Sequence, residues 1–360
     1  MSILYRRQTI AIFIILSLGL LRGSISYPKS EGNVADNTAI DSINFGELVS
    51  GDAFSKEDLR NYAVGIEFWR IKYPPCSCGC GGRKPLSNPI EWHAKYESKG
   101  LILLAFHIAG DETKEEIIAL CKSNKIDFPI YKGGRIKGIQ ISDIPTFILF
   151  DHRGDMVYNG DPKQAGPVLD KTMASAPDPL VGEGTYKKLK ALAQKIKVRE
   201  ELGKTLSVLQ AKYLNSADAD EKAEAGELAA RLARYGNRLV KKARRKKDAE
   251  PLEAFNLYRE VAALFKGNEI GDAAEKTVKE LKTDKDFQDN IKAEKEYDDI
   301  AAEVTKLKQC GKCGAFNHKC AACKKMNPSF DMVRQKSKAL AEKYPNSSAA
   351  NKLKELLPLE

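Results

Sequence analysis

Four short apolar runs, rich in β-branched and aromatic residues, occur in the first half of the chain, and none follows about Tyr186. The runs are VGIEFW (64–69), LILLAFHI (101–108), FPIY (128–131) and TFILF (146–150). Their length and composition are typical of buried β-strands. A helical pattern, DETKEEIIALCKSNKI, lies between the second and third runs. Strands that alternate with helices predict a layered α/β domain with parallel strand pairing.

From about Tyr186 onward, apolar residues recur only at helical spacing, as Leu228, Leu232, Tyr235 and Leu239 do. The segments 258–281 and 333–356 each follow the order helix, aromatic residue, polar turn, helix. These two segments resemble tetratricopeptide-type helical hairpins. We therefore expect an all-α, tetratricopeptide-like domain over residues 185–360, joined to the α/β domain by a hinge at DPLVGEG (178–184).

The first 26 residues have the order of a secretory signal peptide. Arg6 and Arg7 precede an apolar stretch from about Ile10 to Leu21, and Ser26 ends a segment of small residues. The apolar stretch is shorter than the roughly 20 residues that span a bilayer, so a membrane anchor is disfavoured. We expect cleavage after Ser26, export to the periplasm or cell envelope of a bacterium, and no membrane span in the mature chain.

Residues 27–43 are polar and without pattern, and predict a flexible leader ahead of a domain at 44–177. The chain has 360 residues, of which 42% are hydrophobic and 30% charged, which is enough for at least two folded domains.

The net charge is +10, and the strongest basic run, LVKKARRKKDAE (239–250), falls on a helical pattern. No aromatic residues interleave with it, as a surface for single-stranded nucleic acid would require. We interpret the run as a solvent-exposed helix face and expect no nucleic-acid partner.

The stretch FWRIKYPPCSCGCGG (68–82) places Cys76, Cys78 and Cys80 directly after the first predicted strand. An oxidising compartment outside the cytoplasm allows such cysteines to persist as disulfides. The glycines and prolines of this stretch and of the following residues predict an irregular loop, with a helix from about Pro89 to Tyr96.

The α/β segment, over about residues 45–165, resembles the thioredoxin-like superfamily and, within it, the exported TlpA-like thiol–disulfide oxidoreductases. The resemblance depends on VGIEFW followed by PPC, on KGLILLAFHIAGD as the second core strand, and on ISDIPTFILFDHRGDMVYNG (141–160). In the last of these, Ile144–Pro145–Thr146 is similar to the cis-proline loop of the family. The resemblance implies a thioredoxin-like fold with Pro145 beside the active-site cysteines.

The family's Cys-x-x-Cys motif is incomplete in this chain. The family uses a first cysteine as the attacking thiolate and a second to resolve the mixed disulfide. Aligning YPPC with that motif places Tyr73 at the attacking position and Cys76 at the resolving position. The resemblance also implies a buried proton-carrying carboxylate at Glu67, although on an alternating strand Glu67 is equally able to face solvent.

Three interpretations of the cysteine trio are open. The first is a relocated redox pair, Cys76 with Cys80 or Cys78, next to cis-Pro145. The second is capture of a soft metal, Zn²⁺ or Cu⁺, by the clustered thiolates. The third is a static disulfide or an inactive remnant. Cys121 is separate from these, because it shares an apolar helical stripe with Ile117 and is expected to be a core residue.

A second cluster, KQCGKCGAFNHKCAACKK, contains two Cys-x-x-Cys pairs: Cys310 with Cys313, and Cys320 with Cys323. Four sulfurs at this spacing favour a closed tetrahedral Zn²⁺ site of structural type. Two disulfides are the alternative. Neither pair is followed by histidine, which disfavours covalent haem. We expect no organic cofactor.

The sequence thus predicts an exported thioredoxin-like protein with a degenerate active site that exchanges disulfides with protein thiols or disulfides. The helical region would select a protein partner. The alternative is a non-catalytic envelope module that uses the same fold to bind protein or metal.

Overall fold

The computed structural model describes residues 40–71, 86–108, 110–308, 310, 312–313 and 319–356. All of these belong to one compact unit, Asp36–Glu360. The predicted signal peptide, Tyr73 and the cysteine trio Cys76, Cys78 and Cys80 lie outside the described residues. Within the described ranges, no helix has the length and apolarity needed to span a bilayer.

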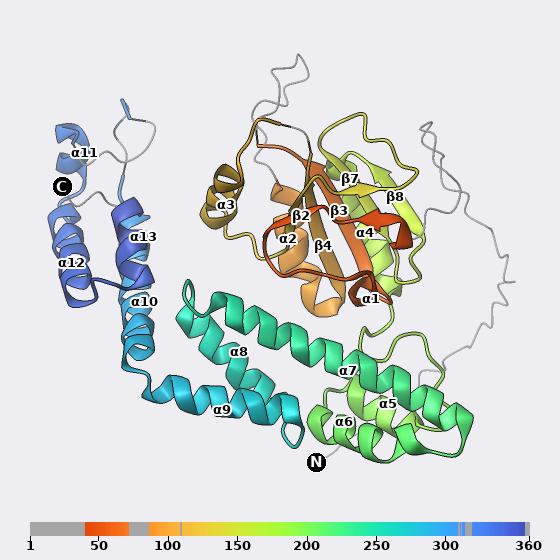
Figure 1. The fold of residues 1–360 in the computed structure, drawn as a ribbon. Helices are drawn as coiled ribbons and strands as arrows, with labels where there is room; N and C mark the ends of the chain where they lie inside the picture. Colours follow the sequence, from red (N-terminus) through yellow and green to blue (C-terminus); the bar gives the residue numbers. More distant parts are fainter. Residues whose placement is uncertain are drawn as a thin grey trace, which may run out of the picture. The chain divides into compact units, whose positions relative to one another are not determined.

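A six-stranded mixed sheet forms the centre of the α/β part (Figure 1). Its strands, in spatial order, are β2 (Glu47–Ser50), β5 (Ile130–Lys132), β4 (Leu101–His107), β3 (Ala63–Trp69), β7 (Thr146–Phe150) and β8 (Met156–Gly160). The four strands predicted from apolar runs are β3, β4, β5 and β7. The parallel pairing that we expected holds for β3 with β4 and for β4 with β5, whereas β7 runs antiparallel to β3.

The residues of β3 alternate between two buried faces of the sheet. One face, with Ala63 and Trp69, shares a core with residues of the helices α2 (Ser87–Tyr96), α3 (Lys114–Ser123) and α4 (Pro162–Ser175). Both faces are covered, which is why β3 is apolar along nearly its whole length.

The other face of β3, with Val64, Ile66 and Phe68, packs against Ile40 and Ile43. These two residues belong to a 3₁₀ helix (Ile40–Ser42) and to strand β1 (Ile43–Asn44), which pairs with β6 (Arg135–Ile136). Helix α1 (Lys56–Leu59) contributes Leu59 to the same core. Ordered structure therefore begins before residue 44, the start that we expected from the sequence.

The α/β part has the thioredoxin-like fold that the sequence resemblance implied. The central strand β3 lies between a parallel neighbour, β4, and an antiparallel neighbour, β7, and helices pack on the sheet. The peptide bond between Ile144 and Pro145, immediately before β7, is cis.

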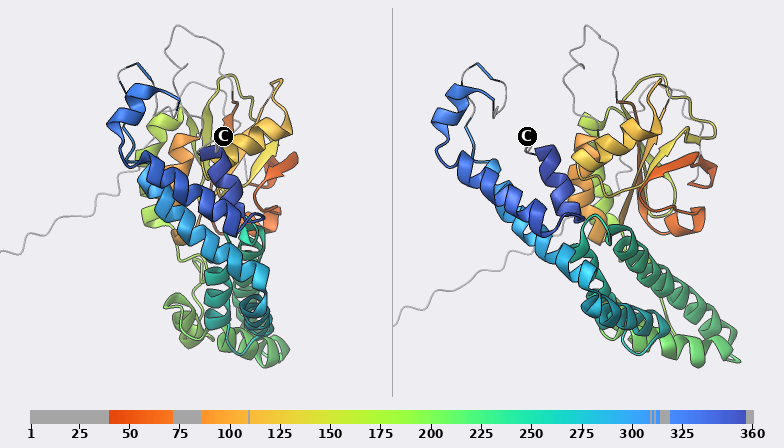
Figure 2. Two further views of the ribbon diagram at one scale, coloured as in Figure 1. Left: turned by 90° about the vertical axis from the view of Figure 1, so that its left-hand side faces the viewer. Right: turned by 60° about the vertical axis from the view of Figure 1, so that its left-hand side comes forward.

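After α4, the secondary structure of the described residues is helical, as predicted (Figure 2). Its helices are α5 (Lys190–Lys197), α6 (Leu202–Ala211), α7 (Ala219–Lys246), α8 (Pro251–Leu264), α9 (Glu269–Thr283), α10 (Lys285–Val304), α11 (Ala321–Met326), α12 (Phe330–Lys343) and α13 (Ser348–Leu356). The two predicted hairpins are the pairs α8–α9 and α12–α13, and Phe265 and Tyr344 end their first helices.

Phe265 fixes the turn between α8 and α9. Its side chain is fully buried, and its backbone lies so close to Gly203 and Gly271 that a Cβ atom at either glycine would come within 2.2 Å of the Phe265 carbonyl group. A side chain at Gly203 would therefore push the hairpin away from α6, and one at Gly271 would push α9 away from the turn.

The segment 178–184, which we predicted to be a hinge, is packed against the helical region. Leu180 is fully buried in the helical core, and Asp178 forms an ion pair with Arg199 at 3.0 Å. Tyr186 donates a hydrogen bond to the carbonyl of Val181.

From the sequence we expected the basic run on α7 to be a solvent-exposed helix face, which is wrong for part of it. Lys241 and Arg244 are exposed, but another face of the run contacts the α/β part. Lys242 Nζ lies 3.0 Å from both Asp127 Oδ2 and Glu97 Oε1, and Arg245 Nη2 lies 2.7 Å from Asp127 Oδ1. The side chain of Lys246 is only 6% exposed and is 3.5 Å from Asp127. Helical spacing places these three cations on one face of α7, and that face meets carboxylates from distant loops.

Candidate functional site

The carboxyl end of β3 is the position from which the predicted cysteine loop leaves the sheet. Phe68 is paired with Thr146 of β7, so Pro145 lies beside the end of the strand, where Trp69 is buried. Because the cysteine trio is outside the described residues, its place beside Pro145 stays a prediction.

Three ionisable side chains are buried near this end of the sheet. Glu67 is 3% exposed, His107 1% and Glu112 3%. Glu67 and Trp69 are paired with Ala105 and His107 of β4, so Glu67 faces the covered side of the sheet and not solvent. Of the two orientations that the sequence left open for Glu67, the structure has the buried one.

His107, for which the sequence predicted no role, contacts Glu112 and Trp69. Its Nε2 lies 3.6 Å from Glu112 Oε2, and its ring meets the edge of Trp69 at 5.2 Å between centroids. Burial lowers the pKa of His107, although Glu112 acts in the opposite direction. A neutral imidazole is therefore favoured in this pocket.

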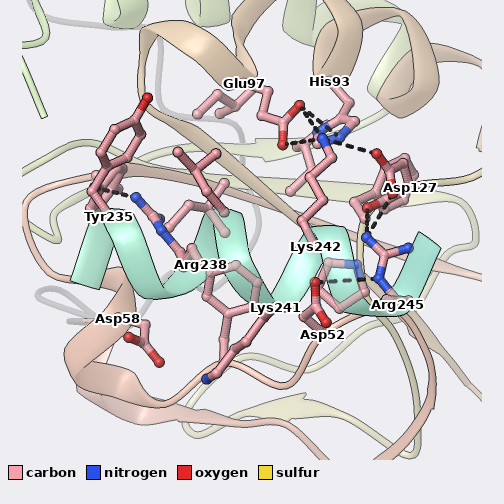
Figure 3. A pocket seen from close by; sticks show the side chains of 18 of the residues that line it. Asp52, Asp58, His93, Glu97, Asp127, Tyr235, Arg238, Lys241, Lys242 and Arg245 are labelled. Atoms are coloured by element: carbon pink, nitrogen blue, oxygen red, sulfur yellow. Dashed lines mark hydrogen bonds and ion pairs between the residues drawn. The ribbon is translucent and has the colours of Figure 1, made fainter. Parts of the chain in front are cut away.

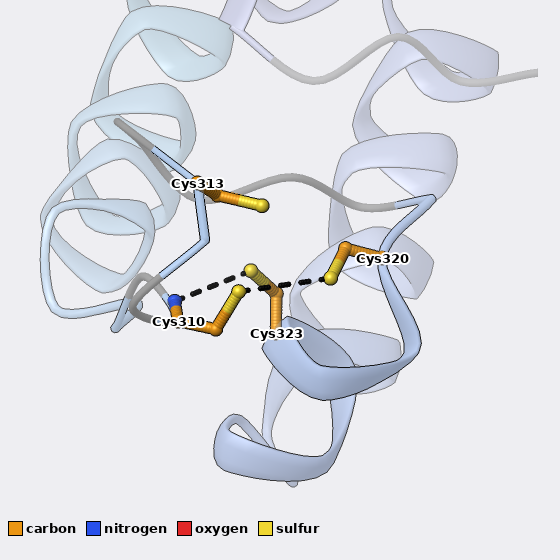
Figure 4. A group of neighbouring side chains, drawn as sticks. All are labelled: Cys310, Cys313, Cys320 and Cys323. Atoms are coloured by element: carbon orange, nitrogen blue, oxygen red, sulfur yellow. Dashed lines mark hydrogen bonds between the residues drawn. The ribbon is translucent and has the colours of Figure 1, made fainter.

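The second cysteine cluster brings its four sulfur atoms to within 4.8 Å of one another (Figure 4). All four cysteines are free, and the Sγ atoms of Cys310 and Cys320 are 3.7 Å apart. A disulfide requires about 2.0 Å, whereas a tetrahedron with Zn–S bonds of about 2.3 Å has edges of about 3.8 Å. The residues present fit a tetrahedral metal ion and do not form the disulfides that we considered as the alternative.

The cluster has a buried side and a more open side. Cys310 and Cys323 are 6% and 0% exposed, and Cys313 and Cys320 are intermediate. The backbone N–H of Cys310 donates to Sγ of Cys323 at 3.4 Å, and the N–H of Cys313 donates to the carbonyl of Cys310 at 3.0 Å. The first of these bonds reaches a sulfur atom, and an N–H donated to sulfur stabilises the thiolate, which is the form that binds metal.

The two more open thiols have opposite pKa shifts. A backbone N–H from Cys323 is the main cause that lowers the pKa of Cys320, the residue that caps the start of α11. The hydrogen bond with Cys310 raises the pKa of Cys313 to about 12. Cys320 therefore loses its proton more readily than an ordinary cysteine and Cys313 less readily, and binding of a metal ion by all four thiolates would release the remaining protons.

Asn327 is a structural residue of this cluster that the sequence did not reveal. Its side chain accepts a hydrogen bond from the N–H of Lys308 at 2.7 Å, and donates to the carbonyls of Lys308 at 2.8 Å and Cys323 at 2.7 Å. It is 6% exposed. Asn327 therefore ties the chain entering the first cysteine pair to the helix that carries the last cysteine. No spacing rule marks an asparagine at that place.

Replacing Asn327 with alanine is expected to weaken Zn²⁺ affinity roughly 10- to 100-fold, because outer hydrogen bonds orient metal ligands. Competition against a chromogenic zinc chelator measures this change. Asn351→Ala, at an exposed position on α13, is the matched control and should leave the affinity unchanged. Equal affinities for wild type and Asn327→Ala would show that the amide does not position the sulfurs.

No family model and no curated protein matches this chain. Solved structures that are similar in part include a thiol-disulfide isomerase from Corynebacterium glutamicum, with 20% identity, a TM-score of 0.32, and coverage of 39% of this chain and 99% of that chain. A thioredoxin family thiol:disulfide interchange protein from Chlorobium tepidum has 17% identity, a TM-score of 0.31, and the same two coverages, 39% and 99%. A DsbF homologue from Corynebacterium diphtheriae has 19% identity and a TM-score of 0.29, with coverage of 36% and 84%. These likenesses identify no activity, substrate or partner.

Proposed function

We propose that this chain is an exported bacterial thioredoxin-like protein that exchanges disulfides with protein thiols through Cys76, paired with Cys80 or Cys78, beside Pro145. The observation that supports this most is the carboxyl end of β3, where Trp69 and Pro145 lie at the root of the cysteine loop and the carboxyl group of Glu67 is buried nearby. The periplasm or cell envelope is the compartment in which such cysteines cycle.

The exchange has two steps. A thiolate of the loop attacks a substrate disulfide, forms a mixed disulfide and releases one substrate thiolate; a second loop thiolate then attacks the mixed disulfide and releases the other. The substrate is reduced by two electrons and the loop pair is oxidised to a disulfide, which a dithiol reductant restores. Glu67, as a buried carboxylate, would accept the proton of the second thiol.

The test is the reduction of insulin by dithiothreitol in the presence of the full chain. Wild type should exceed the uncatalysed rate, and a triple variant with Cys76, Cys78 and Cys80 changed to serine should return to that rate. Cys121→Ser is the control, because the Cys121 thiol is buried and burial raises its pKa to about 11, which makes it a poor nucleophile. Catalysis that persists in the triple variant would contradict the proposal.

A non-catalytic envelope module is the second candidate function. It is favoured by Tyr73, which the sequence aligns with the attacking cysteine of the family, because a tyrosine hydroxyl cannot replace a thiolate in disulfide exchange. In the same assay this candidate predicts that wild type adds nothing to the uncatalysed rate. The helical hairpins α8–α9 and α12–α13 would then bind the protein partner directly.

We also propose that Cys310, Cys313, Cys320 and Cys323 hold a structural zinc ion. Four protein ligands leave no open coordination position, so the ion would stabilise the fold and take no part in exchange. It would join the end of α10 to the short helix α11 ahead of α12.

A further inference from the structure

A cavity of about 270 Å³ lies where α7 meets the α/β part of the chain (Figure 3). Tyr62, which precedes β3, and Leu101, which begins β4, are among its lining residues. The cavity is therefore at the amino ends of these strands, whereas the cysteine loop leaves the carboxyl end of β3. Neither thiol exchange nor metal binding uses it.

Much of the cavity wall is apolar. The apolar lining comes from both parts of the chain and includes Phe54, Leu101, Leu103, Phe128, Leu239 and Leu257. The volume is just below the range of about 300 to 1,000 Å³ that is usual for pockets that bind drug-sized molecules. A ligand of this cavity is thus a small molecule with an apolar body.

Most of the charged groups in the wall are already neutralised within the protein. Asp127 and Glu97 form ion pairs with Lys242, each at 3.0 Å, and Asp52 forms one with Arg245 at 3.3 Å. These pairs are drawn on one side of the cavity in Figure 3.

The remaining charged groups of the wall are either held in place or exposed. Asp58 accepts hydrogen bonds from the backbone N–H and the hydroxyl of Ser55, both at 2.9 Å, and so caps α1. Lys241 and Glu260 are exposed to solvent.

Arg238 is different, because its contacts in the described part of the chain include no carboxylate. It donates a hydrogen bond to the hydroxyl of Tyr62, and its guanidinium carbon lies 4.4 Å from the centre of the Tyr62 ring. A guanidinium group carries five N–H donors and a permanent charge, so donors remain for a ligand. In Figure 3 it lies next to Tyr235, which also lines the cavity.

We propose that this cavity binds a small organic monoanion with an apolar body, whose carboxylate or equivalent group pairs with Arg238 and whose apolar body contacts Leu239 and Leu257. The N–H donors of Arg238 would form charge-assisted hydrogen bonds with the anion. The apolar body of the ligand would remove apolar wall surface from water, which also favours binding. The proposal does not depend on thiol exchange.

Isothermal titration calorimetry of the full chain with hexanoate tests this directly, with hexan-1-ol and hexylammonium as uncharged and cationic probes of the same length. Hexanoate should bind saturably and more tightly than the other two. Arg238→Gln should weaken hexanoate binding roughly 10-fold or more, since hydrogen bonds to charged groups are among the stronger ones. The same change should leave hexan-1-ol binding almost unaltered.

Lys222→Gln is the matched control, because it removes one positive charge from an exposed position of α7 outside the cavity. Leu257→Phe fills the apolar part and should abolish binding of both hexanoate and hexan-1-ol, with thermal unfolding confirming that the variant is folded. No saturable binding of hexanoate to wild type, equal binding to Arg238→Gln, or tighter binding of hexylammonium would each overturn the proposal. Insulin reduction is measured in a separate assay, so the anion-binding proposal and the thiol-exchange proposal are tested independently.

Discussion

Changing Cys323 to serine is expected to reduce the zinc content of the purified protein from about one ion per chain to background, because a closed zinc site requires four strong ligands. Cys323 is the most buried of the four cysteines, with no exposed surface, and it accepts the backbone N–H of Cys310. A serine hydroxyl is a much weaker ligand than a thiolate and would leave three sulfurs. Elemental mass spectrometry of the dialysed protein measures the zinc-to-chain ratio.

The same substitution, or chelation of the metal, is expected to unfold the segment around α11. A six-residue helix is far too short to be stable by itself, and the free energy of metal binding becomes free energy of folding in such segments. Hydrogen exchange over residues 319–327 should therefore become fast. The α12–α13 hairpin should stay folded, because it shares an apolar core with α10 that includes Ile300, Leu340 and Leu353.

Cys121→Ser is the control for both measurements, since Cys121 is also buried but lies in the core of the α/β part. It should leave one zinc ion per chain and slow exchange near α11. A Cys323→Ser protein that still carries one zinc ion, or a wild-type protein with no metal and no thiol open to alkylation, would refute the zinc proposal.

Changing Asp127 to asparagine is expected to lower the free energy of unfolding by about 2 kcal/mol, because three partly or fully buried cations lose the one carboxylate that they share and keep only their other partners, which include Glu97, Asp52 and Glu250. Asp127 lies within 4.0 Å of three cations, Lys242, Arg245 and Lys246, and its side chain is only 20% exposed. Urea denaturation followed by circular dichroism measures the change.

Asp289→Asn is the matched control for this measurement. The ion pair of Asp289 with Lys292, at 2.9 Å, is on the surface and lies within one helix, and such pairs contribute less than about 1 kcal/mol. A loss for Asp127→Asn no larger than the loss for this control would show that the contact between α7 and the α/β part does not depend on Asp127.

The effect of Asp127 has a defined pH dependence. Burial by itself would raise the pKa of Asp127, but Lys242, Arg245 and Lys246 outweigh it and hold the pKa below the ordinary value. The stabilisation is therefore complete above the unfolded-state pKa of about 3.9 and is lost as the pH falls through the lower pKa of the folded state. The difference between wild type and Asp127→Asn should be constant near neutral pH and should shrink in acid below about pH 4.

The sequence predicted the main strands and the helical hairpins because the local pattern of apolar residues is enough to indicate these elements. The residues of β3, β4 and β7 are apolar and β-branched or aromatic, and Phe265 and Tyr344 mark the ends of helices at a recognisable turn. The spacing of the two Cys-x-x-Cys pairs also predicted that these four cysteines lie together, and the structure brings their sulfur atoms to within 4.8 Å of one another.

What the sequence did not predict depends on contacts between distant residues. Lys242 and Arg245 have the spacing of an exposed helix face, and only the fold brings Asp52, Glu97 and Asp127 against them. The two-residue strands β1 and β6 are too short to have a period. Asn327 is one polar residue among many until its amide is seen between two backbone carbonyls.

The length of β3 sets the distance between the two ends of the sheet in the α/β part. The strand is seven residues long, so its first and last residues are about 20 Å apart at a rise of about 3.3 Å per residue. Tyr62, at one end, is held by Arg238 of α7, and the cysteine loop departs from the other. If exchange runs through the cysteine loop as proposed, a client protein would approach the sheet from the end opposite to the one where Arg238 holds Tyr62, and its binding would not require α7 to be displaced.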